Sequence, residues 1–150
     1  MTDAPARPDL ASLTGLEQMR ALASGAFAHR GIGHTLGFRL DAVEEGRVVF
    51  AGTPGPEVYN PLGQVHGGYA ATLLDSACGC AVHTRLAPGR GYTTLEIKVA
   101  YHRGMSADTG EVKAEGVVTH FGRRTAYAEA RLTDGAGKLV ASATSTLMLL

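Results

Sequence analysis

The segment from Gly67 to about Arg85 constrains the fold of this chain most. Its larger apolar residues recur at intervals of three and four, which is the spacing of one face of an α-helix. The other faces carry mostly small residues, and Asp75 is the only Asp, Glu, Lys or Arg between residues 58 and 84. Because a helix that is apolar nearly all round must be enclosed, we expect a long central helix with a sheet wrapped around it. The apolar stripe consists of Ala70, Leu73, Leu74, Ala77, Ala81 and Val82.

Strand-like segments lie on both sides of this helix. Before it, two alternating runs separated by the turn Glu45-Gly46 predict a hairpin. After it, four alternating or apolar runs are separated by turns rich in Gly, Asp and Ser, and we expect consecutive antiparallel strands forming a meander. The fold class is therefore α+β, with one curved antiparallel sheet around one helix. The predicted strands span residues 36–41, 48–51, 92–102, 111–121, 125–133 and 139–149.

A further helix is expected near the N-terminus. Thr14 and Glu17 have the spacing of a capping box, and an apolar stripe follows from Leu16 to Phe27. The glycines in residues 31–33 would end this helix. Residues 1–10 contain no apolar run that could serve as a signal peptide or membrane anchor. We expect a flexible tail over residues 1–10 and a single domain over residues 11–150.

Composition excludes several classes of protein. The 150 residues include 14 basic and 14 acidic side chains with no Lys/Arg block, so the charge pattern of a nucleic-acid binder is missing. No window approaches the ~18 apolar residues that span a bilayer. Cys78 and Cys80 are two positions apart on the predicted helix, where they cannot easily form a disulfide, and they suit the core of a protein in a reducing compartment. We expect a cytoplasmic protein whose partner is a small molecule or another protein.

Two common kinds of hydrolase site are missing from the sequence. The six histidines include no His-x-x-x-His pair on one helix face, and no Cys-x-x-Cys or carboxylate cluster accompanies them. No Gly-x-Ser-x-Gly motif is present. A metal hydrolase and a serine hydrolase are therefore both disfavoured.

The motif Asn-Pro-Leu-Gly-Gln-Val-His-Gly-Gly, residues 60–68, leads directly into the central helix. The backbone N–H groups of Gly67 and Gly68 would belong to the unpaired first turn, at the positive end of the helix dipole. They could face the oxygen of a carbonyl under attack, where one preorganised donor contributes about 2.7–4 kcal/mol. The alternative is that the two glycines only form a tight turn.

Asp75 is the main candidate for a catalytic group. No Lys or Arg occupies positions 71, 72, 78 or 79, so no ion pair within the helix can satisfy its carboxylate. An unpaired buried charge is costly, which favours a carboxylate that faces a pocket over a core carboxylate held by hydrogen bonds or a distant Arg. It could act as a general base towards water or as a nucleophile that forms a mixed anhydride. The sequence leaves both routes open.

Together, the motif of residues 60–68, Asp75 and the strand from Thr93 to Tyr101 resemble the hotdog-fold acyl-CoA thioesterases of the phenylacetate-degradation (PaaI-like) branch. Residues 120–123 and 137–141 are similar to two late strands of that family, so the resemblance covers about residues 36–149. It implies a hotdog fold and hydrolysis of an aryl- or medium-chain acyl-CoA to the free acid and CoA. It also implies that no metal or organic cofactor is needed.

The resemblance assigns roles to three more residues. Asn60 would orient the attacking water or the thioester, and His66 would fix the loop or polarise the thioester carbonyl. Thr94, or less readily Thr93, would place a hydroxyl near the scissile bond. Each residue has a structural alternative, since Asn before Pro starts turns, a lone His is often structural and Thr favours strands.

The family resemblance further implies a dimer with composite sites. Asp75 would face Asn60, His66 and Gly67 of the neighbouring chain, and we expect a homotetramer built from two such dimers. Subunit pairing would also cover open sheet edges. The candidates for binding CoA phosphates are Arg103, Arg123 and Arg124, which could otherwise be solvated surface charges. Gly68 and Tyr69 are candidate substrate contacts, and the candidates for lining the acyl pocket are Tyr59, Leu62, Tyr69 and Leu73.

A non-catalytic acyl-CoA-binding or sensing hotdog protein is the alternative function. Asp75 distinguishes the two, because a protein that only binds needs no carboxylate beside the thioester. Hydratases and dehydratases of the same fold are disfavoured because their motif is missing from the sequence.

Overall fold

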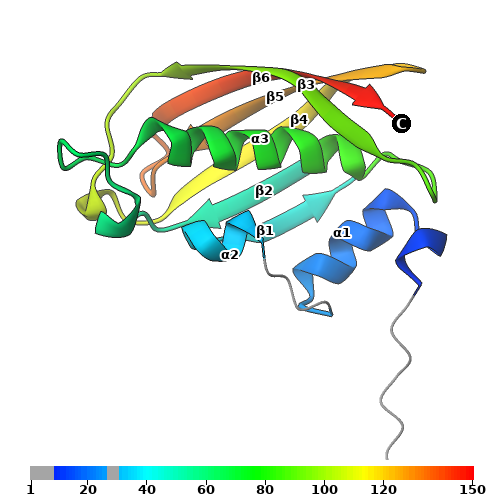
Figure 1. Cartoon of the computed structure of the whole chain (residues 1–150), viewed down its shortest axis with the longest axis horizontal. Helices are drawn as coiled ribbons and strands as arrows, with labels where there is room; N and C mark the ends of the chain where they lie inside the picture. Colours follow the sequence, from blue (N-terminus) through cyan, green and yellow to red (C-terminus); the bar gives the residue numbers. More distant parts are fainter. Residues whose placement is uncertain (1–8, 27–30) are drawn as a thin grey trace, which may run out of the picture.

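The computed structural model describes residues 9–26 and 31–150. Figure 1 shows one sheet curved around the long helix α3, with the short helices α1 and α2 on the side of strand β1. In chain order the elements are η1 (Leu10–Ser12), α1 (Gly15–Ala23), α2 (Ile32–Leu36), β1 (Phe38–Glu44), β2 (Arg47–Gly52), η2 (Pro56–Val58), α3 (Gly67–His83), β3 (Tyr92–Tyr101), η3 (Ala107–Thr109), β4 (Val112–Phe121), β5 (Thr125–Thr133) and β6 (Leu139–Leu149).

The six strands form one antiparallel sheet in the order β1-β2-β4-β5-β6-β3. This confirms the α+β class and the hotdog fold. The expectation of a meander through all four late strands is wrong, because β3 pairs with β6 at the sheet edge and β4 pairs with β2. An alternating pattern identifies strands, but it does not specify which distant strand completes the hydrogen bonds of each edge.

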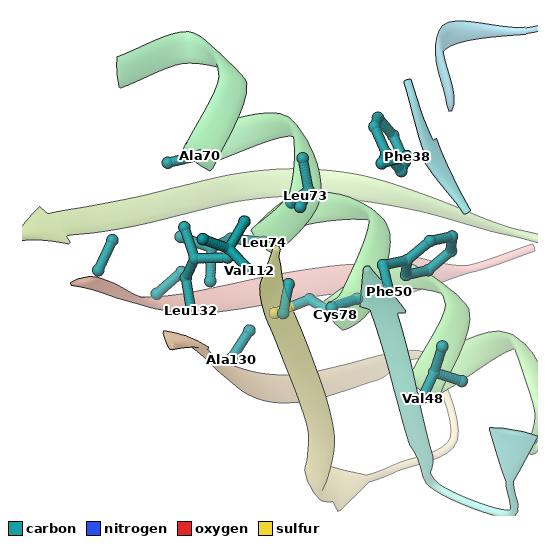
Figure 2. Close-up of a cluster of buried hydrophobic side chains, with 14 of the residues drawn as sticks. Phe38, Val48, Phe50, Ala70, Leu73, Leu74, Cys78, Val112, Ala130 and Leu132 are labelled. Atoms are coloured by element: carbon teal, nitrogen blue, oxygen red, sulfur yellow. The ribbon is translucent and has the colours of Figure 1, made fainter. Parts of the chain in front are cut away.

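Helix α3 contributes many side chains to the hydrophobic core, as its apolar pattern predicts. Its buried side chains pack against the inner face of the sheet, where Figure 2 shows Leu73, Leu74 and Cys78 facing side chains from several strands. Gly116 of β4 lies so close to α3 that an added Cβ would overlap the Ala77 carbonyl. Helix and sheet therefore meet at backbone contact distance, which only glycine permits.

The N-terminal helix forms with the predicted cap but ends early. The Thr14 hydroxyl accepts from the Glu17 N–H at 3.3 Å, and the Glu17 carboxylate accepts from the Thr14 N–H at 2.8 Å. The helix ends at Ala23 because Gly25 takes a positive φ of 76°. The expected continuation of the helix is therefore wrong for residues 24–26, and Phe27 lies outside the described residues. Residues 1–8 of the expected tail also lie outside them.

Helix α2 is an element that the alternating pattern missed. Leu36, expected to start a strand, is instead the last residue of α2, and Gly37 with φ 70° turns the chain into β1. The apolar spacing of Leu36, Phe38 and Leu40 fits a strand, but the left-handed glycine separates helix from strand.

The two edges of the sheet differ. Helix α1 packs against β1, whereas β3 has β6 on one side and no described strand on the other. Two large side chains of β3 are exposed, Leu95 at 54% and Tyr101 at 56%. An open edge with exposed apolar side chains is a surface on which another strand can pair.

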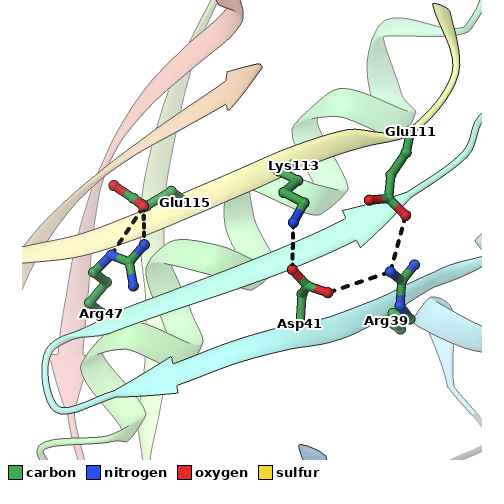
Figure 3. Close-up of polar contacts among 6 residues, drawn as sticks. All are labelled: Arg39, Asp41, Arg47, Glu111, Lys113 and Glu115. Carbon is green, nitrogen blue, oxygen red and sulfur yellow. Dashed lines mark hydrogen bonds and ion pairs between the residues drawn. The ribbon is translucent and has the colours of Figure 1, made fainter. Parts of the chain in front are cut away.

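The outer face of the β1, β2 and β4 region is charged, as Figure 3 shows. Lys113 contacts Asp41 at 2.9 Å, and Arg39 contacts Glu111 at 3.0 Å. These ion pairs are exposed, so each contributes about 0–1 kcal/mol and mainly keeps this face in water. Among residues 9–26 and 31–150, no helix combines the length and apolar character that a membrane span requires.

Candidate active site

Asp75 and Thr94 are brought together by the fold. The Thr94 hydroxyl of β3 donates a hydrogen bond to Asp75 Oδ1 on α3 at 3.1 Å, and both side chains are half-buried. No ion pair of the described residues involves Asp75. The carboxylate is therefore held by a neutral donor, and its second oxygen can act on a substrate or on water.

A β-bulge beside Thr94 helps to aim its side chain. In the β3–β6 pairing Thr94 lies opposite Leu147 and Glu96 opposite Thr146, so Leu95 is the extra residue. Glu96 secures the bulge, since its carboxylate accepts from the Thr146 N–H at 2.8 Å and its carbonyl accepts from the Ser145 hydroxyl at 2.9 Å. The sequence contained no signal for this irregularity, because the alternation around it is not interrupted by Gly or Pro.

Asn60 uses its side-chain oxygen to shape the loop before α3. Asn60 Oδ1 accepts hydrogen bonds from the N–H groups of Leu62 at 2.9 Å and Gln64 at 3.2 Å. A bridge between Tyr59 and Val65 closes the base of the same loop. The turn-forming role of Asn60 is therefore present, while its NH₂ group remains a donor for a ligand.

His66 caps helix α3 and thereby gives the N–H groups of Gly67 and Gly68 different roles. His66 Nδ1 accepts from the Gly68 N–H at 2.8 Å, so the neutral ring carries its proton on Nε2. The Gly68 N–H is thus already used. No described residue accepts a hydrogen bond from the Gly67 N–H, which leaves Gly67 as the donor at this helix end.

Tyr101 is a residue of this region that the sequence did not single out. Its hydroxyl donates to the Gly67 carbonyl at 2.8 Å, and an added Cβ on Gly67 would lie 3.1 Å from its ring. Nothing in its position at the end of a strand signalled this contact, which forms only because β3 passes over the start of α3.

Within one chain the site residues form two separate groups. Asn60, His66 and Gly67 lie at the start of α3, whereas Asp75 and Thr94 meet at its middle. An α-helix rises 1.5 Å per residue, so eight residues separate Gly67 from Asp75 by about 12 Å. Within one chain, Gly67 and Asp75 therefore lie more than two helical turns apart.

The three arginines also lie apart. Arg103 lines a cavity of about 370 Å³ together with Gly67 and Tyr101. Arg123 and Arg124 are exposed in the β4–β5 turn, where the Arg124 carbonyl accepts from the Leu149 N–H at 2.9 Å near the end of β6. The end of β6 pairs with the start of β3, so these two lie at the opposite end of β3 from Arg103.

Tyr69, a candidate substrate contact, is placed in the core. It is 3% exposed, and its hydroxyl is enclosed with no partner among the described residues. Burial raises the pKa of Tyr69 to about 12, so the phenol is neutral. Of the other residues expected to line an acyl pocket, Leu73 is fully buried and Leu62 is 90% exposed at the tip of the Asn60 loop.

Within residues 9–26 and 31–150, no group of three or more His, Cys, Asp or Glu side chains is arranged to hold a metal ion. The free cysteines Cys78 and Cys80 belong to the apolar surroundings of α3. Burial raises the pKa of each thiol to about 12, with the Asp75 charge as a second cause. Both are therefore neutral, and Asp75 is the one carboxylate that α3 carries.

Comparisons with known proteins agree with this geometry. A family model described as the Thioesterase superfamily matches residues 62–141, more than half of the chain, including Asp75 and Thr94. A 1,4-dihydroxy-2-naphthoyl-CoA hydrolase of Listeria monocytogenes serotype 1/2a (strain 10403S) is 29% identical over 117 residues, which cover 78% of this chain and 94% of that protein.

Solved structures show the same fold. A phenylacetic acid degradation-related protein from Ralstonia eutropha JMP134 superposes with a TM-score of 0.78 at 27% identity, over 87% of this chain and 98% of that one. A mutant form of the phenylacetic acid degradation protein PaaI from Thermus thermophilus gives a TM-score of 0.70 at 31% identity, over 77% of this chain and 96% of that one.

The chain therefore belongs to the Thioesterase superfamily, and it is a thioester hydrolase with the hotdog fold. Its structural neighbours include PaaI-like proteins of phenylacetic acid degradation, as the sequence motif predicts.

Proposed function

We propose that this protein is an acyl-CoA thioesterase that hydrolyses an aryl- or medium-chain acyl-CoA to the free acid and CoA. The observation that carries the proposal is Asp75, a half-buried carboxylate on an otherwise apolar helix, oriented by the Thr94 hydroxyl. The relative named as a naphthoyl-CoA hydrolase and the phenylacetic acid degradation proteins support an aromatic acyl group.

Asp75 can promote hydrolysis by two routes. As a general base it accepts a proton from water, whose oxygen bonds to the carbonyl carbon; the carbon–sulfur bond then breaks and the CoA sulfur takes up the proton. As a nucleophile its oxygen bonds to that carbon and expels CoA, and water then hydrolyses the mixed anhydride. In both routes a Gly67 N–H stabilises the negative carbonyl oxygen, a contribution of about 2.7–4 kcal/mol for one such donor.

The two groups of site residues support a composite site in a homodimer. One chain leaves about 12 Å between Gly67 and Asp75, but two antiparallel copies joined through the open β3 edges can place Asp75 beside Gly67 of the partner subunit. Asn60 and His66 would join the site with that glycine. The homotetramer would then be a dimer of these dimers.

The CoA end of the substrate carries phosphates, which arginine side chains bind by charge-assisted hydrogen bonds. Arg103 lies at the Gly67 end of α3, and Arg123 and Arg124 lie at the other end of β3. Because arginines lie near both ends of β3, CoA can meet a guanidinium whichever way it leaves the composite site.

Release of free CoA from a panel of acyl-CoAs tests the proposal. The panel contains phenylacetyl-, hydroxybenzoyl-, short-, medium- and long-chain acyl groups, and wild type is compared with Asp75→Asn. We expect the variant to lose about 10² or more in turnover, the contribution of a general base. Binding of acyl-CoA by wild type without any release of CoA would instead establish a non-catalytic acyl-CoA-binding protein.

A single turnover in isotope-labelled water tests for the anhydride route. Hydrolysis of the anhydride at the Asp75 carbonyl puts the label into Asp75, which establishes the nucleophilic route, whereas attack of water at the substrate carbonyl, in either route, puts it into the product acid. Mass spectrometry of the product and of the peptide that contains Asp75 gives the result.

A further inference from the structure

A cavity of about 530 Å³ lies between helices α1 and α2, the β1–β2 hairpin and α3. Its walls are mainly apolar, and two of them are the rings of Phe38 and Phe50, which pack edge to face with centroids 5.7 Å apart. Helix α3 contributes Ser76 and Cys80. The volume lies within the range of about 300–1,000 Å³ that is usual for small-molecule sites.

The position of Ser76 connects this cavity to the catalytic carboxylate. Ser76 follows Asp75 in α3, and successive helical residues are turned by about 100°. The cavity therefore begins on the helix face beside that of Asp75, whereas Thr94 approaches Asp75 from β3. A group attached to a thioester carbonyl at Asp75 can pass over the small Ser76 side chain into the cavity.

Helix α1 forms the outer wall of the cavity, and polar contacts fix the N-terminal half of this helix to the end of α3. The Gly15 N–H donates to the Leu86 carbonyl at 3.0 Å, and His83 Nε2 lies 2.7 Å from Gln18 Oε1. An added Cβ on Gly15 would overlap the His83 carbonyl, so α1 meets the end of α3 at backbone distance. The cavity is thus bounded on one side by an anchored helix, and the α1 side chains that line it form a fixed wall.

The chemistry of the walls suits an uncharged group. Burial raises the pKa of the Cys80 thiol to about 12, so it is neutral. The one Lys or Arg among the described lining residues, Arg39, is paired with Asp41 at 3.4 Å and Glu111 at 3.0 Å. The ionisable side chains offered to a phosphate here are the paired Arg39 and the exposed His34, whereas an apolar acyl group would gain contacts with the apolar walls.

We infer that this cavity is the acyl pocket and that α1 side chains, above all Leu22 and Ala23, set the length of the acyl group. The inference rests on the proposed thioesterase function. It assigns the substrate an apolar acyl group, a ring or a medium-length chain, uncharged at the end remote from the thioester. Phe38 and Phe50 offer ring edges and faces to an aromatic acyl group.

Binding of thioether analogues of acyl-CoA, which cannot be hydrolysed, tests the pocket by calorimetry. Affinity should rise about fourfold per methylene until the pocket is full, and then stop rising. Ala23→Phe should move this limit to a shorter chain, and Leu22→Ala should move it to a chain longer by about three carbons, the number removed from the side chain. The matched controls are Ala21→Phe and Leu16→Ala, on the same helix but outside the lining.

Two outcomes would overturn the inference. One is the same limiting chain length in wild type and both pocket variants. The other is a change in oligomeric state with Leu22→Ala and no change in chain preference, which would indicate that a second copy fills the cavity. Ala23→Phe carries the test by itself if Leu22→Ala does not fold.

The experiments test the acyl pocket and the proposed function separately. Hydrolysis by wild type with an unchanged chain preference in the variants would contradict only the assignment of the acyl pocket. Chain-length-dependent binding without hydrolysis would contradict the thioesterase activity and support the pocket.

Discussion

The Thr94 hydroxyl donates a hydrogen bond to Asp75 Oδ1 at 3.1 Å, joining the edge strand β3 to the middle of α3 across 19 positions of the chain. The bulge at Leu95 lies immediately beside this bond. One carboxylate oxygen is thereby occupied and the side chain is oriented, while the second oxygen stays available. The hydroxyl therefore acts as a positioning group for Asp75.

Removing the Thr94 hydroxyl should lower turnover without unfolding the protein. We expect Thr94→Val to reduce kcat about tenfold or more, since a hydrogen bond to a charged group contributes about 1.5–3 kcal/mol. Thr94→Ser retains the hydroxyl and should stay near wild type. Steady-state kinetics on the preferred acyl-CoA measure both variants, and equal rates for Thr94→Val and wild type would contradict the positioning role.

Mixing two inactive variants should restore activity if the site is composite. Asp75→Asn removes the base or nucleophile, and Asn60→Asp keeps the oxygen that holds the loop while removing the NH₂ donor. Each homodimer should be about 10² slower than wild type. After unfolding and refolding an equal mixture, half of the dimers are mixed and one of their two sites is intact, so about a quarter of wild-type activity should return.

A site contained in a single chain gives a different result in this experiment. Every site would then carry one of the two defects, and the refolded mixture would be as slow as the separate variants. The refolded wild type serves as the control for recovery of material.

Stability should fall as the solution becomes acidic, in part because of His83. Burial lowers the pKa of His83 from its ordinary value of 6.5. As the pH falls through about 6.5, the unfolded chain binds a proton at this position before the folded chain does, so stability that is complete above this pH is progressively lost below it. Thermal unfolding at pH 7.5 and 5.5 should show a smaller drop in Tm for His83→Gln than for wild type. An equal drop in both proteins would exclude this histidine as a contributor.

Gly116 should tolerate no side chain. An added Cβ would overlap the Ala77 carbonyl, and neither the strand backbone nor the helix backbone can move without disturbing the core. We expect Gly116→Ala to lower the free energy of unfolding by about 1–3 kcal/mol or more, the usual cost of overpacking. Gly135→Ala is the matched control, because its added Cβ would lie 3.9 Å from the Glu111 carbonyl oxygen, an ordinary contact. Urea unfolding compares the two, and similar values would contradict the close approach of β4 to α3.

Local chemistry made several elements predictable. The capping box of Thr14 and Glu17 opens α1 as expected because both partners lie within one turn. The start of α3 at Gly67 and the limits of β5 and β6 also agree with the sequence pattern, since alternation and turn residues act over a few positions. The early end of α1 at Ala23 was missed because the apolar stripe continues past Gly25, although the backbone does not.

The sequence by itself determined the fold class, the central helix, the motif before it and the isolation of Asp75 among apolar residues. These are properties of short segments, where hydrophobic period, glycine and proline act locally.

Only the tertiary structure decided that β3 lies beside β6, that Thr94 holds Asp75, that His66 accepts from the Gly68 N–H, and that residues of α1, α2, the β1–β2 hairpin and α3 enclose a cavity. Strand pairing, a bulge and a cavity depend on residues far apart in the chain meeting in space, and no spacing within one segment specifies which distant segment it will meet.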